Sequence, residues 1–65
     1  MRWTDDDRML LMLYGEANRA ETIAALQKMR HCLLADEAEL EAMTSSLIAK
    51  LEKITDMEYQ KIHDE

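Results

Sequence analysis

The stretch MLLMLY at residues 9–14 places six apolar residues in a row, between the acidic run Asp5–Asp7 and Gly15. A helix that is apolar all round is expected to be surrounded by other elements. In a chain of 65 residues, those elements are either the later helices or a second copy of the protein. A membrane span needs roughly 20 apolar residues, so this stretch is too short to be one.

The composition of the whole chain favours helices. The chain contains no proline and one glycine, and it is rich in Ala, Leu, Met, Glu and Lys, which form helices well. Residues that favour strands are too scarce for a sheet. We therefore predict an all-α fold in a single domain over residues 1–65, with a small core of marginal stability. Dimerisation is accordingly an open alternative.

Four predicted helix starts share one signal, which is an Asp, Asn, Ser or Thr N-cap followed three residues later by an acid. The pairs are Thr4 with Asp7, Asn18 with Glu21, Asp36 with Glu39, and Thr55 with Glu58. They predict a small bundle of three main helices, at about 5–14, 19–32 and 37–53, and a short C-terminal helix at 56–63. Gly15 is expected to end the first helix in the left-handed conformation.

Apolar residues recur at spacings of three and four along the two longer helices. They are Ile23, Leu26, Met29 and Leu33, and then Leu40, Met43, Leu47, Ile48, Leu51 and Ile54. These spacings predict faces that pack together, and the short gaps make consecutive helices antiparallel or steeply crossed neighbours. Tyr59 is placed for a hydrophobic staple with Ile54. We expect the methionines to fill an irregular core, with an adaptable binding surface as the alternative.

The formal net charge is −6 at pH 7. Acids gather near predicted helix starts and bases near predicted ends, so we interpret the charges mainly as helix stabilisation and solubility. An alternative class is an acidic antagonist that mimics nucleic acid and occupies the DNA-binding site of another protein. That class predicts a continuous acidic face, with Asp5–Asp7 beside Glu37 and Glu41. Direct nucleic-acid binding through the helix at 37–53 is disfavoured, because its acidic first turn repels phosphate.

No motif in the chain identifies a catalytic, cofactor or metal site. His31 and Cys32 are adjacent, but no further ligand follows at a spacing that completes a metal site, and a catalytic pair needs a third, orienting group. We interpret Cys32 as a buried or half-buried thiol. The hydroxyl residues Thr44–Ser46 have no histidine in the same predicted helix to activate them. The sequence therefore predicts a protein that is not an enzyme.

The single cysteine and the first four residues predict the cellular compartment of the protein. One cysteine cannot close an intramolecular disulfide, and Met1–Thr4 run straight into three aspartates without an apolar targeting segment. Both observations indicate a reducing cytoplasm.

Nearly the whole chain, from Trp3 to about Ile62, resembles the family of putative transposon-transfer assisting proteins found in mobile elements of Firmicutes. The matching segments are WTDDD at 3–7 before the apolar run that ends in Tyr14, NR at 18–19, MR at 29–30 ahead of LL at 33–34, DEAEL at 36–40 and LEKITDMEY at 51–59. These positions are caps and core residues. The resemblance implies a small helical accessory protein, encoded by a conjugative or integrative element, with a role in transfer. It supplies no catalytic or binding residue.

We expect the protein to act through contact with another protein. The expected interface is the part of the helix over Met9–Tyr14 that the other helices leave uncovered, since exposed apolar area on a small protein marks interaction sites. The candidate interface residues are Leu11, Met12 and Trp3, whose ring is also placed to lie against Arg8. A homodimer that hides the same surface is the alternative.

Overall fold

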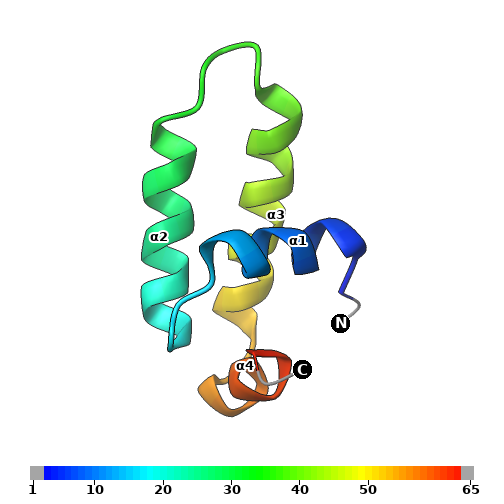
Figure 1. Cartoon of the computed structure of the whole chain (residues 1–65), viewed down its shortest axis with the longest axis vertical. Coiled ribbons are helices and arrows are strands. Elements are labelled where there is room, and N and C mark those ends of the chain that lie inside the picture. Colours follow the sequence, from blue (N-terminus) through cyan, green and yellow to red (C-terminus); the bar gives the residue numbers. More distant parts are fainter. Residues whose placement is uncertain (1–2, 64–65) are drawn as a thin grey trace.

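The computed structural model describes residues 3–63, and over that range the chain forms four helices and no strands. They are α1 (Asp5–Tyr14), α2 (Arg19–His31), α3 (Ala38–Lys53) and α4 (Asp56–His63). α2 and α3 form an antiparallel hairpin, α1 crosses the face of α3, and α4 lies at the end of the hairpin opposite its connecting loop (Figure 1). The prediction of an all-α fold with a short C-terminal helix is confirmed.

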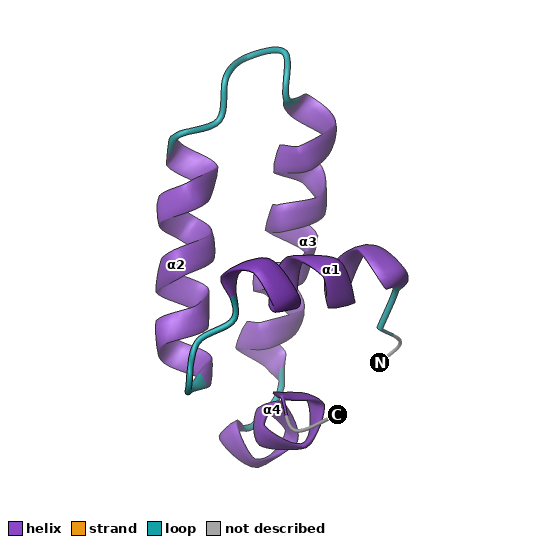
Figure 2. Cartoon of the chain, in the orientation of Figure 1, coloured by secondary structure: helices purple, strands orange, loops and turns teal. Residues whose placement is uncertain are grey.

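The core lies where α1 and α4 meet the α2–α3 hairpin. Its buried apolar residues come from all four helices and from the residue that follows α3: Leu10, Leu26, Leu47, Ile48, Leu51, Ile54 and Tyr59. The spacing of three and four in the two longer helices therefore identifies the faces that pack. The loops between the helices are short (Figure 2), and α2 packs against both of its neighbours in the chain, α1 and α3.

A buried hydrogen-bonded cluster ties α4 to the start of α2. The hydroxyl of Tyr59 lies 2.7 Å from the carbonyl oxygen of Glu16 and 2.5 Å from the hydroxyl of Thr22. The Thr22 hydroxyl also accepts from the backbone N–H of Glu16 at 2.9 Å. Thr22 and Tyr59 are both buried, so their polar atoms are paired inside the core, as buried polar groups must be. The apolar spacing gave no signal for Thr22, because its buried group is polar.

Three of the four predicted N-caps form. Thr4 and Asp7 make a complete capping box, in which each backbone N–H donates to the other side chain at 3.1 Å. The Asn18 side chain accepts from the backbone N–H three residues on at 2.8 Å. Thr55 does the same at the start of α4, at 3.1 Å. These caps satisfy backbone donors that the first turn of each helix leaves without partners.

The predicted cap at Asp36 is wrong. α3 begins after Glu37, whose side chain makes no capping hydrogen bond. The backbone N–H of Glu37 donates to the carbonyl oxygen of Leu34 at 2.9 Å, so Asp36 lies inside a turn and not at the cap position. Accordingly α2 ends at His31 and α3 begins at Ala38, each one residue short of the predicted bound.

Gly15 ends α1, but not in the predicted left-handed conformation. Its φ of −62° and ψ of 139° are extended, and its backbone N–H donates to the carbonyl oxygen of Leu11 at 2.7 Å. A Cβ atom on this residue would lie 2.2 Å from the same oxygen. Glycine is therefore required because a side chain at this position would clash with the backbone of Leu11. The requirement does not come from a left-handed conformation.

Candidate functional site

The exposed face of α1 carries three large apolar side chains. Met9 is 41% exposed, Met12 80% and Leu13 64%. Positions three and four apart lie on one face of a helix, so these residues form a single patch, which we call the α1 stripe. Leu10, between Met9 and Met12 in sequence, is buried in the core. The helix that is apolar all round is thus covered on one side only.

The three predicted interface residues divide between the surface and the core. Met12 belongs to the α1 stripe, whereas Trp3 and Leu11 are partly buried and pack against the core. Met9 and Leu13 were missed. Met12 and Leu13 lie three and four residues after Met9, and this spacing identifies the patch once Leu10 is known to be buried.

The expectation that the methionines fill the core is wrong for three of them. Met9, Met12 and Met57 are exposed, whereas Met29 and Met43 are partly buried against the core. Met57 lies on α4, and the other strongly exposed large apolar residue, Leu34, lies in the loop between α2 and α3. Scattered single apolar residues are normal on a protein surface. The α1 stripe differs because its three members adjoin one another.

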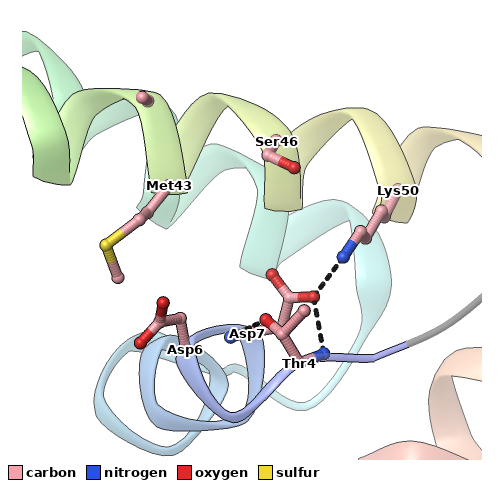
Figure 3. Close-up of a pocket in the computed structure, with 7 residues that line it drawn as sticks. Thr4, Asp6, Asp7, Met43, Ser46 and Lys50 are labelled. Carbon is pink, nitrogen blue, oxygen red and sulfur yellow. Dashed lines mark hydrogen bonds and ion pairs between the residues drawn. The ribbon is translucent and has the colours of Figure 1, made fainter.

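A charged contact fixes the rotation of α1 on α3. The Nζ of Lys50 donates to the Asp7 carboxylate, which is also held by the backbone N–H of Thr4 (Figure 3). The same Nζ lies 5.9 Å from the centre of the Trp3 ring, within the range of a cation–π contact. The cation over that ring is therefore Lys50 of α3, where the sequence predicted Arg8. This contact turns Leu10 inward and the stripe outward.

The Asp7 carboxylate is ionised at neutral pH. Burial alone would raise the pKa of this group, but hydrogen bonds from Lys50 and Thr4, together with the charge of Lys50, outweigh that effect and hold the pKa below its ordinary value. Asp7 is buried, so its charge is directed at Lys50 and not at solvent. The acidic face that an antagonist of DNA-binding proteins requires therefore lacks one of its three expected aspartates.

A shallow groove of about 310 Å³ runs between α1 and α3, beside this ion pair. Its lining residues are Thr4, Asp6, Asp7, Ala42, Met43, Ser46 and Lys50. Figure 3 shows Asp6 on α1 below Met43 and Ser46 on α3. The exposed Asp6 places a carboxylate where the groove meets solvent.

The remaining candidate groups have structural roles or stand alone. Cys32 is exposed at the end of α2, which corrects the prediction of a buried or half-buried thiol. The Thr44 hydroxyl is buried and donates to the Leu40 carbonyl oxygen at 2.8 Å, and Ser45 accepts from Arg30 at 3.2 Å.

Within residues 3–63, no three His, Cys, Asp or Glu side chains are grouped to hold a metal ion. None of the described helices has the length and apolar character to cross a membrane.

Comparison with known protein families identifies a match over the described part of the chain. A family model described as putative transposon-transfer assisting protein matches residues 3–63, which is nearly the whole chain. No curated protein and no solved structure matches the chain.

Proposed function

Because this chain belongs to the family of putative transposon-transfer assisting proteins, we propose that it is a non-enzymatic accessory protein that assists transfer by binding another protein. The family description names an accessory role in transposon transfer. A helper without chemistry of its own acts by contact, so its function requires a surface that a partner recognises. The compartment in which this contact takes place is, on the same proposal, the cytoplasm.

The α1 stripe is the observation that supports this proposal. A domain of 65 residues has little apolar area to spare, because its small core is of marginal stability. Leaving Met12 and Leu13 in water forgoes roughly 1.5–3 kcal/mol for each side chain that could be fully buried. Methionine adds adaptability, since its flexible and polarisable side chain fits irregular partner surfaces. Adjacent exposed apolar residues on one helix are typical of a protein interface.

Two matched variants test whether the stripe carries the function. Met12→Ser/Leu13→Ser removes most of the stripe, and Leu34→Ser/Met57→Ser removes one leucine and one methionine of comparable exposure elsewhere. Both variants leave the net charge unchanged. In capture from a lysate of cells that carry the mobile element, with nuclease and at two salt concentrations, the first variant is expected to lose a stoichiometric partner that the second retains.

The outcomes separate the proposal from its alternatives. If both variants retain the partner at low salt, and the partner is lost at high salt, the acidic antagonist is supported instead, because exposed charge pairs are screened. A wild-type dimer that Met12→Ser/Leu13→Ser converts to a monomer would show that a second copy covers the stripe. Equal loss or equal retention of the partner by both variants at high salt would contradict the role of the stripe.

A further inference from the structure

We propose that the α1 stripe binds an amphipathic basic segment of the partner, with apolar side chains on Met12 and Leu13 and a lysine or arginine at Asp5 and Asp6. This inference rests on the proposed function and specifies its partner. It specifies the charge of the partner, which the apolar contact alone does not determine.

The charges of α1 differ from those of the two longer helices. α2 and α3 each carry basic residues in the last turn, which oppose the negative end of the helix dipole. α1 has Asp5–Asp7 in its first turn and no basic residue in its last turn. Asp7 is paired with Lys50. The two exposed acids Asp5 and Asp6 outnumber Arg8, the exposed base of α1, so the stripe lies in a net negative environment that favours a cationic partner.

The geometry brings acid and apolar groups to one face. Asp5 and Asp6 lie four and three residues before Met9, so they occupy the same side of α1 one turn earlier. Both aspartates are exposed. The groove between α1 and α3 adjoins Asp6 and is lined on α3 by Met43 and Ser46 (Figure 3), which gives a long basic side chain of the partner room to extend. A segment lying along α1 can therefore place a base at the acids and apolar side chains on the stripe.

The same charges oppose a second copy of the chain on this face. Two α1 helices packed in parallel would bring Asp5 and Asp6 of one copy beside those of the other. In an antiparallel pair centred on Leu11, Asp6 of one copy would face Glu16 of the other, which is also an exposed acid. Like charges meet in both arrangements, and such contacts are unfavourable. A basic segment gains attraction from the same residues.

The test is a titration of the purified protein with three synthetic helical peptides of one amphipathic pattern. Their apolar residue is leucine and their polar residue is lysine, glutamine or glutamate. We expect the leucine–lysine peptide to bind most tightly and the leucine–glutamate peptide least. Met12→Ser/Leu13→Ser should weaken binding of the leucine–lysine peptide about tenfold or more, and Leu34→Ser/Met57→Ser should leave it unchanged.

A second pair of variants tests the location of the charge. Asp5→Asn/Asp6→Asn and Glu21→Gln/Glu41→Gln each remove two exposed acids from the first turn or turns of helices. The aspartate variant should weaken the leucine–lysine peptide by about threefold to tenfold at low salt and leave the leucine–glutamine peptide unaffected. Equal weakening by both variants would overturn the inference, because the attraction would then come from the net charge.

The remaining outcomes distinguish this inference from the proposed function. If the three peptides bind equally and Met12→Ser/Leu13→Ser weakens all of them, the preference for a basic segment is wrong and the apolar interface stands. If that variant binds every peptide as the wild type does, the stripe is not the binding surface for this chemistry. Wild-type self-association that the stripe variant abolishes would identify a second copy as the occupant and overturn the inference.

Discussion

Lys50, in the last turn of α3, donates to the carboxylate of Asp7, in the first turn of α1. The two side chains are 21% and 5% exposed, so water competes only weakly for either charge. α1 lies far from α3 in sequence, and this contact joins the two helices on the side of α1 that meets the core. The position of the stripe on the surface therefore depends on it.

Asp7→Asn is expected to lower the free energy of unfolding by about 2 kcal/mol, because it leaves Lys50 near the core without its carboxylate partner. Urea denaturation followed by far-UV circular dichroism measures this change. Asp5→Asn is the matched control, since Asp5 lies in the same first turn but is exposed, and its effect should be below about 1 kcal/mol. Equal effects of the two variants would show that the ion pair does not hold α1 in place.

The stability of the protein should fall in acid through Asp7. The pKa of this carboxyl is lower in the folded chain than in the unfolded one, so the unfolded chain binds more protons between the two values. The stabilisation is complete above the ordinary pKa of about 3.9 and is lost as the pH falls through the lower folded value. Asp7→Asn should therefore show a weaker decrease of the thermal midpoint between pH values of about 6 and about 2 than the wild type. Parallel decreases would contradict this assignment.

Tyr59→Phe should cost about 1–3 kcal/mol of unfolding free energy, because it removes the hydroxyl that contacts Glu16 and Thr22 in the core. Tyr14→Phe is the control, as Tyr14 is only partly buried at the end of α1, and we expect a change below about 0.5 kcal/mol. Thermal and urea unfolding of both variants measure the difference. A Tyr59→Phe variant as stable as the Tyr14→Phe variant would mean that the buried hydroxyl contributes nothing.

Gly15→Ala and Gly15→Asn should destabilise the protein by similar amounts, each above about 1 kcal/mol, since either Cβ would clash with the carbonyl oxygen of Leu11. Asparagine tolerates the left-handed conformation better than alanine does. The two variants therefore distinguish a close approach from a left-handed cap. If asparagine is tolerated and alanine is not, the left-handed conformation is the requirement.

The helices and their packed faces could be predicted from the sequence because their signals are local. Caps such as Thr4 and Asn18 act within one turn, and the apolar spacing of α3 defines one face unambiguously. The N-cap predicted at Asp36 is wrong because the backbone N–H of Glu37 closes a turn onto the carbonyl oxygen of Leu34. The identity of a capping residue does not reveal such a turn.

The candidate site was harder to predict, for a physical reason. Six consecutive apolar residues carry no periodicity, so nothing within residues 9–14 distinguishes an inward side from an outward side. The distinction comes from Asp7 and Lys50, which are far apart in sequence. Met12 could be identified as a candidate, but Leu11 could not be assigned to the core without that contact.

Leu11 and Met12 should therefore respond differently to substitution, although they are adjacent. Leu11→Asp is expected to unfold much of the population, because Leu11 packs against the core and a buried charge without a partner is costly. Met12→Asp should lower the unfolding free energy by less than about 1 kcal/mol, since its side chain is 80% exposed. Circular dichroism compares the two directly. A well-folded Leu11→Asp variant would contradict the placement of Leu11.

Site-specific photo-cross-linking in cells detects whether a partner protein binds the α1 stripe. A photoreactive amino acid is placed at Leu13, in the stripe, or at Met57, an exposed apolar position on α4, in cells that carry the mobile element. We expect one discrete, nuclease-resistant protein adduct from position 13 and none from position 57. An adduct from position 57 alone, or the same adduct from both positions, would contradict this expectation.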